Sequence, residues 1–156
     1  MLKDEIKKRK PFDDPAEEAY LNLLRTAAVL GTDFERLFKA AGLSEPQYNV
    51  LRILRGAPDH RLPTLEIASR MITRAPNITR LIDKLVRKKF VSRCDHDRDR
   101  RVVVVQLTPG GLDLVNGISA AINNLDVRGL DALSKTQVAT LIEILDAVRS
   151  EPGERR

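Results

Sequence analysis

The stretch from Thr73 to Lys89 carries side chains that suit contacts with a polyanion. It joins guanidinium, ammonium, hydroxyl and amide groups with aliphatic residues at i, i+3, i+4 and i+7, a spacing that gathers the aliphatic residues on one side of an α-helix. These are Ile78, Leu81, Ile82 and Leu85. The polar residues fall on the opposite side or flank it. The pattern therefore predicts a helix with one face for packing and one for binding.

The chemistry of the polar face matches nucleic acid. Arginine can donate two hydrogen bonds to a guanine edge and asparagine can pair with adenine, while hydroxyl and ammonium groups hold phosphates. We predict a helix from Arg74 to Lys88, and its candidate contacts are Arg74, Pro76, Asn77, Thr79, Arg80, Lys84 and Arg87. The sequence leaves open which of them meets a base and which a phosphate. We expect Asp83 to pair with Arg80 or Arg87 on the same helix.

Positive charge is concentrated in this region. Residues 74–101 hold ten basic and four acidic residues, a balance of +6, whereas the rest of the chain holds 17 basic and 18 acidic residues, a balance of −1. The net charge of +5 thus belongs to the predicted helix and the loop after it. A surface helix with a solvated charged face is the alternative, but this local excess favours a nucleic-acid partner.

The neighbouring elements predict a winged helix-turn-helix. Thr64 is a plausible N-cap for a short helix through Met71, and only a few residues separate that helix from the basic one. After Lys89, two β-branched runs predict strands over 90–94 and 101–107. The charged segment between them predicts a hairpin tip, the wing, whose candidate DNA contacts are Arg98, Asp99, Arg100 and Arg101. A self-neutralising tip is the alternative for these residues.

Further helices flank this lobe. Residues 15–42 predict a long helix that stops at Gly42, although Gly31 interrupts its pattern. Ser44 with Gln47 predicts a capping box for the next helix, and Thr108 and Ser134 are predicted N-caps of two C-terminal helices. The aromatic residues Tyr20, Phe34, Phe38 and Tyr48 are expected in the core, with the lining of a ligand pocket as the alternative. Because the flanking helices carry more apolar surface than a small lobe needs, we expect a homodimer.

Composition narrows the function classes. A chain of 156 residues is about one domain, and it shows neither an apolar run of membrane-spanning length nor a signal peptide, so we expect a cytoplasmic protein. A metal site at Cys94, Asp95, His96 and Asp97 is disfavoured because adjacent residues point in different directions. A redox-sensor role for Cys94 is also disfavoured. Neither a phosphate-binding glycine loop nor a nucleophile with a plausible base is recognisable, so no enzyme activity and no cofactor are predicted.

Four segments in register resemble the MarR family of bacterial transcriptional regulators. They are Leu43–Leu51, Leu65–Ala68, Ile78–Leu85, and Asp99–Arg101 with Leu107–Gly111. The resemblance covers roughly residues 15–150. It implies a homodimer of winged helix-turn-helix subunits that binds a pseudo-palindromic operator, often as a repressor released by a small aromatic ligand. By register, Asp99 and Arg101 match the family's wing aspartate and minor-groove arginine.

One position departs from the family pattern. Lys89 stands where the family commonly has a glycine that ends the recognition helix. A non-glycine residue in the left-handed conformation costs about 1 to 2 kcal/mol. A helix end and a wing angle that differ from the family's are therefore alternatives here. Cys94 also does not match the N-terminal cysteine of oxidation-sensing members.

The sequence predicts a mainly α protein with a small β-hairpin wing. The expected organisation is a flexible basic arm over 1–14, a dimerisation helix over 15–42, a winged helix-turn-helix lobe over 43–107, dimerisation helices over 108–150 and a tail over 151–156. The predicted function is a dimeric regulator that binds double-stranded DNA and has no membrane association. A winged-helix protein-interaction module without operator specificity is the alternative.

Overall fold

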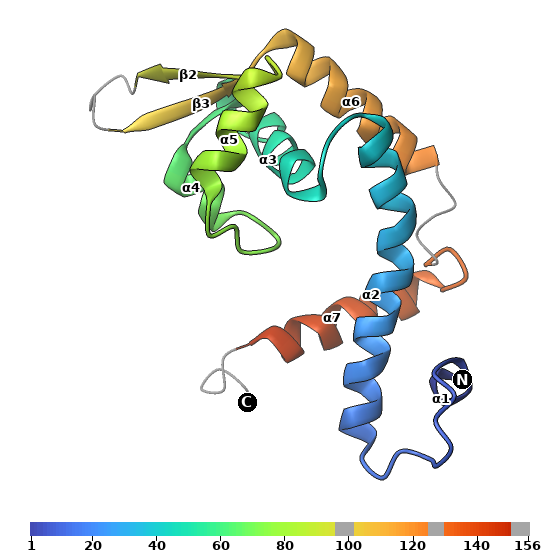
Figure 1. Ribbon diagram of the computed structural model, residues 1–156. Coiled ribbons are helices and arrows are strands. Elements are labelled where there is room, and N and C mark those ends of the chain that lie inside the picture. The colour runs from blue at the N-terminus through green and yellow to red at the C-terminus, as the bar shows by residue number, and fades with distance from the viewer. Residues whose placement is uncertain (96–101, 125–129, 151–156) are drawn as a thin grey trace. The chain divides into compact units, whose positions relative to one another are not determined.

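The computed structural model describes residues 1–95, 102–124 and 130–150. The chain forms two compact units, Met1–Asn124 and Leu125–Arg156. Among the described residues, the first unit holds six α-helices and a small antiparallel sheet, and the second unit holds one helix, α7 (Figure 1). This is the mainly helical architecture with a small β-wing that the sequence predicts.

The long helix α2 spans Pro15–Ala40 without a break at Gly31. Asp14 caps its start, where the carboxylate accepts a hydrogen bond from the Ala16 N–H at 2.8 Å. The predicted stop is confirmed, because Gly42 takes a φ of +69° and lets the Leu43 N–H return to the Phe38 carbonyl. A short helix α1, Leu2–Glu5, precedes α2 and was not predicted. Glu5 pairs with Arg25 of α2 at 3.2 Å.

Helix α3, Glu45–Arg55, supplies the centre of the core. Its predicted capping box is confirmed, with the Ser44 N–H donating to the Gln47 side-chain oxygen at 3.0 Å. Val50, Leu51 and Leu54 are fully buried. The expectation of core aromatics is right for Phe38 and Tyr48, whose rings stack with centroids 4.5 Å apart. It is wrong for Tyr20, which is 60% exposed.

The helices α4, Thr64–Ser69, and α5, Ile78–Arg87, form the helix-turn-helix pair. Thr64 is the first residue of α4 and not its N-cap, a position held by Pro63. The Thr64 hydroxyl instead donates to the Val103 carbonyl at 3.1 Å. The two helices are also further apart in the chain than a tight turn allows, because residues 70–77 all lie between them.

A three-stranded antiparallel sheet completes the lobe. The predicted hairpin strands are β2, Val91–Asp95, and β3, Val103–Leu107. The sequence analysis missed one strand, β1, which spans Arg61–Pro63. It pairs with the other edge of β3, so the strand order is β1-β3-β2. It was missed because three residues ending in proline show no strand periodicity. The strands place Leu62, Val91 and Val105 in the same core as α3.

Helix α6, Pro109–Asn124, starts at the predicted cap. The Thr108 hydroxyl accepts a hydrogen bond from the Gly111 N–H at 3.0 Å, and Val115 and Ile118 of α6 are buried in the core. In the second unit, the Ser134 capping box starts α7, Lys135–Arg149, as predicted. None of the described helices is long and apolar enough to cross a membrane.

Candidate nucleic-acid interface

Helix α5 is divided into a buried and a charged face, as its sequence pattern predicts. Ile82 and Leu85 are fully buried beneath it. Thr79, Arg80, Lys84 and Arg87 are exposed on its outer side. The close packing of α5 on α3 and β2 fixes the direction in which these polar side chains project.

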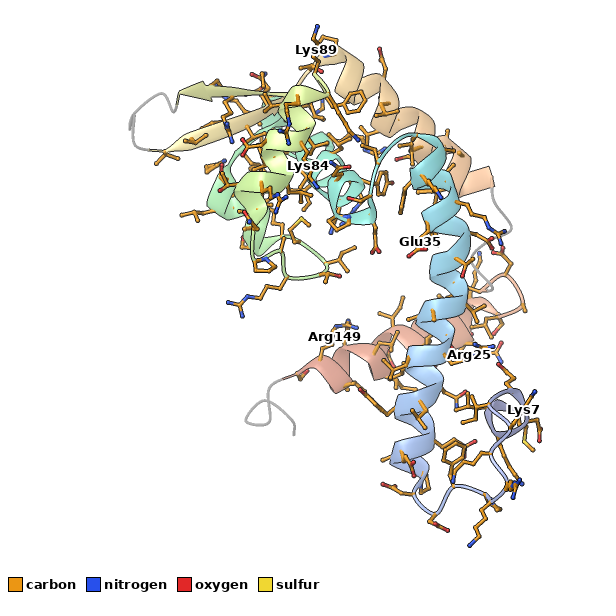
Figure 2. The ribbon with its side chains drawn as sticks, viewed as in Figure 1. Lys7, Arg25, Glu35, Lys84, Lys89 and Arg149 are labelled. Carbon is orange, nitrogen blue, oxygen red and sulfur yellow. The ribbon has the colours of Figure 1, made fainter. Side chains whose placement is uncertain are left out.

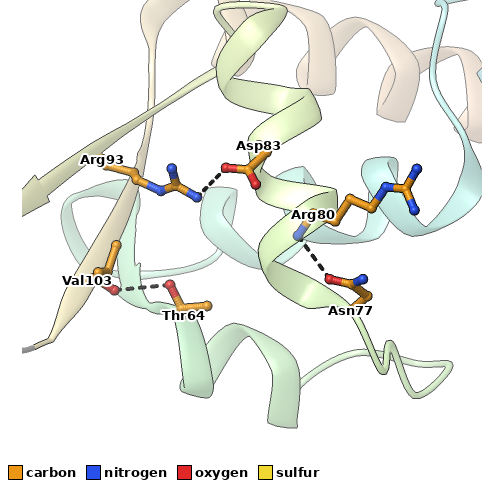
Figure 3. A network of polar contacts seen from close by, with 6 residues as sticks. All are labelled: Thr64, Asn77, Arg80, Asp83, Arg93 and Val103. Carbon is orange, nitrogen blue, oxygen red and sulfur yellow. Dashed lines mark hydrogen bonds and ion pairs between the residues drawn. The ribbon is translucent and has the colours of Figure 1, made fainter.

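The helix starts later than predicted. Arg74, Ala75 and Pro76 lie in the connection before α5, and Asn77 is its N-cap. The Asn77 side-chain oxygen accepts a hydrogen bond from the Arg80 N–H at 3.3 Å (Figure 3). The prediction took Pro76 as a first-turn residue, whereas asparagine at the cap satisfies a backbone N–H that would otherwise lack a partner. Arg74 and Pro76 thus remain exposed at the entrance to α5 but outside it.

Asp83 has a different partner from the one expected. Its carboxylate lies 2.5 Å from a guanidinium nitrogen of Arg93 in β2, and not beside Arg80 or Arg87 (Figure 3). The side chains of both residues are partly exposed, at 41% for Arg93 and 44% for Asp83. The pair therefore joins the helix to the first wing strand. It leaves Arg80 extended on the other side of the helix (Figure 3).

Lys89, which follows the C-cap residue Lys88 of α5, takes the left-handed conformation expected of a glycine at this position. Lys89 has a φ of +60°. Its N–H donates to the Val86 carbonyl at 2.9 Å, and the Phe90 N–H donates to the Leu85 carbonyl at 3.1 Å. This hydrogen-bond pattern is a Schellman motif. The helix end is therefore retained, and the substitution leaves conformational strain at Lys89.

The start of α6 holds this turn in place. The Thr108 hydroxyl lies 2.8 Å from the Lys89 carbonyl oxygen, and the Thr108 N–H donates to the Phe90 carbonyl at 3.1 Å. A Cβ atom on Gly111 would lie only 2.0 Å from the Phe90 oxygen, so no side chain fits there. Lys89 lies where α5 ends beside α6 (Figure 2). The turn between recognition helix and wing is thus fixed from a third element.

The predicted tip of the wing lies outside the described residues. This applies to Arg98, Asp99, Arg100 and Arg101, as well as to His96 and Asp97 of the disfavoured metal cluster. Among the described residues, no group of three potential ligands could hold a metal ion. Cys94 is half-buried in β2, with its sulfur 3.8 Å from the Val104 carbonyl oxygen. The two strands that carry the wing are paired from Val91↔Leu107 to Asp95↔Val103.

A helix-turn-helix followed by a paired hairpin, with a cationic outer face on the second helix, defines a winged-helix DNA-binding protein. The family model described as MarR family matches residues 43–103. A MarR transcription factor from Planctomyces limnophilus is 38% identical, with 87% of this chain and 98% of that one covered and a TM-score of 0.65. The chain belongs to the MarR family, whose members are transcriptional regulators and not enzymes.

Two further proteins are similar to the chain. The HTH-type transcriptional repressor YetL of Bacillus subtilis is 37% identical over 100 residues, which are 64% of this chain and 60% of that repressor. The chain therefore matches less than two thirds of that repressor's length. Sco3205, a MarR family regulator from Streptomyces coelicolor solved in complex with DNA, is 26% identical with a TM-score of 0.73. That comparison covers 90% of this chain and 91% of the other.

Proposed function

We propose that the protein is a transcriptional repressor that binds a pseudo-palindromic operator as a homodimer. The observation that carries this proposal is the outer face of α5, where cationic and hydrogen-bonding side chains project from a helix that packs against α3, α4 and β2. The family membership supports DNA binding, and the similarity to the repressor YetL supports repression.

In this proposal α5 enters the major groove. Arg80 is the candidate for a base contact and Asn77 caps the start of the helix beside it. Thr79, Lys84 and Arg87 supply hydroxyl, ammonium and guanidinium groups for bases or phosphates. Arg74 and Pro76 approach the DNA from the connection before the helix. The wing arginines Arg98, Arg100 and Arg101, with Asp99 to orient one of them, are proposed to reach the adjacent minor groove.

Exposed apolar side chains support the homodimer. Of the 26 residues of α2, Phe38 is the buried one, while Tyr20, Leu24 and Val29 are each more than half exposed. In α7, Ile142, Ile144 and Val148 are also more than half exposed. Apolar residues at this density on two helices are typical of surfaces that are covered by a second subunit.

A cavity between α2, α3 and α6 supports release by a small aromatic ligand. Its volume is about 550 Å³, within the range of small-molecule sites. Phe34, Phe38 and Tyr48 contribute aromatic surface, and Asn49 and Arg52 contribute polar groups. An aromatic ligand could stack on these rings and direct a polar group to the amide or guanidinium. Because α3 packs against α5, a change in this cavity can be transmitted to the recognition helix.

Electrophoretic shift with the DNA upstream of the gene tests the proposal. We expect a complex from which unlabelled operator DNA displaces the labelled DNA, whereas unrelated DNA does not. Arg80→Ala should relax the base preference by about 1 to 3 kcal/mol per contact. Arg36→Ala is the matched control, because Arg36 is exposed on α2 and pairs with Asp33 at 3.2 Å. Binding that ignores sequence at physiological salt would instead favour a protein-interaction module.

The dimer is tested separately by sedimentation at low micromolar concentration. A dimer would place two recognition helices about one helical turn of DNA apart. A folded monomer at that concentration would overturn the two-half-site operator.

A further inference from the structure

The edge of α5 that borders α3 forms a cationic depression. Its volume is about 370 Å³, and the described residues that line it are Ser44, Gln47, Lys84, Arg87 and Lys88. Three of these are cations and none is acidic. Lys84 lies where α5 borders α3 (Figure 2). The depression therefore joins the C-terminal half of the recognition helix to the start of α3.

The two exposed edges of α5 differ in charge. On the edge toward the wing, Asp83 and Arg93 neutralise one another at 2.5 Å. At about 100° per residue, Arg80, Lys84, Arg87 and Lys88 share the remaining exposed surface, within about 100° of one another. Among the described residues, no carboxylate forms an ion pair with Lys84, Arg87 or Lys88. The positive charge of α5 is thus directed toward α3.

The depression is held by local structure on both sides. The Lys88 ammonium donates to the Gly42 carbonyl, which belongs to the left-handed turn between α2 and α3. Gln47 is buried and its side chain bonds the Ser44 N–H, so the first turn of α3 is fixed. The Ser44 side chain is exposed at the rim. These contacts fix Lys88 and the first turn of α3, so two sides of the depression are in place before a ligand arrives.

We infer that this depression, the α3–α5 seat, binds a backbone phosphate of the operator strand that runs along the α3 side of α5. Lysine ammonium groups contact phosphate oxygens from several directions and arginine can contact two of them at once. The inference rests on the proposed function, because α5 has to enter the major groove for a strand to pass over its edge. A phosphate here would set the depth and register of α5 without reading sequence.

The salt dependence of operator binding tests the seat. The triple variant Lys84→Gln/Arg87→Gln/Lys88→Gln loses the one phosphate contact of each subunit, which should reduce the slope of log Kobs against log salt concentration by about 0.9 per subunit. Each single variant, Lys84→Gln, Arg87→Gln or Lys88→Gln, should show a part of this reduction. Affinity for an unrelated duplex should fall by the same factor as affinity for the operator. Lys135→Gln removes one exposed charge from α7 and should leave the slope unchanged. Arg87→Lys keeps the positive charge at this position and should retain most of the wild-type slope.

Ethylation of single operator phosphates locates the contact. In the wild type, ethylation should interfere at a phosphate flanking each half-site, and this interference should be lost in Arg87→Gln. Thermal unfolding of each variant shows whether it is folded.

Unchanged slopes in folded variants, with wild-type operator binding intact, would overturn the seat alone. Stabilisation of the wild type by inorganic phosphate with unchanged slopes would assign the depression to a small anion and overturn the inference. Absence of any specific operator complex with the wild type would overturn the proposed function.

Discussion

A guanidinium nitrogen of Arg93 in β2 lies 2.5 Å from the carboxylate of Asp83 in α5. The pair connects the recognition helix to the first strand of the wing, two elements that the chain places on either side of the strained Lys89 turn. It also removes the one acidic side chain of α5 from competition for the cations of the helix. Arg80, Lys84 and Arg87 are therefore available to DNA without rearrangement.

The first prediction concerns the strength of this pair. Both side chains are more than 40% exposed, so solvent screening limits the contribution of the pair to stability. A double-mutant cycle with Asp83→Ala and Arg93→Ala should give a coupling energy of about 0.2 to 1 kcal/mol. Urea unfolding at one fixed protein concentration measures it. A coupling above about 2 kcal/mol would mean that the pair is shielded from solvent.

Sequence periodicity was sufficient to predict the binding face of α5, because its aliphatic spacing is regular and its polar residues are dense. The caps at Ser44, Thr108 and Ser134 were also predictable, since each is a local motif. Three features were not. The partner of Asp83 lies ten residues away across a turn, and β1 gains its strand character only from pairing with β3. The start of α5 was also missed, because Pro76 suits the first turn of a helix while Asn77 suits the N-cap that it occupies.

The second prediction uses the left-handed residue at the end of α5. Lys89→Gly should raise the free energy of unfolding by about 1 kcal/mol, because glycine removes the strain while losing more chain entropy on folding. Lys89→Ala is the control, since alanine keeps the strain and removes the same charge. Urea unfolding of the three proteins gives the comparison. If the glycine variant is no more stable than the alanine variant, Lys89 carries no strain.

The third prediction concerns the contact between α6 and the helix end. Gly111→Ala places a Cβ atom 2.0 Å from the Phe90 oxygen, which forces the turn and α6 apart. We expect a loss of stability of about 1 to 3 kcal/mol or more. Gly110→Ala is the matched control, because a Cβ atom there meets nothing within 4 Å. Equal stability of the two variants would show that α6 does not clamp Phe90.

The fourth prediction separates two roles of Asn77. Bidentate pairing with adenine needs both the amide oxygen and the amide nitrogen, but the oxygen already accepts the Arg80 N–H at 3.3 Å. As a cap, Asn77 should be replaceable by serine with little loss, whereas Asn77→Ala should destabilise the protein by about 0.5 to 2 kcal/mol.

Unfolding and operator titrations on the same three proteins distinguish the roles of Asn77. If Asn77 acts only as a cap, Asn77→Ser should match the wild type in stability and in discrimination between operator variants. If it reads adenine, Asn77→Ser should stay stable but lose about 1 to 3 kcal/mol of discrimination at one base pair of each half-site. We expect the first outcome, because breaking the cap to contact a base would leave the Arg80 N–H without its partner at the point where α5 begins.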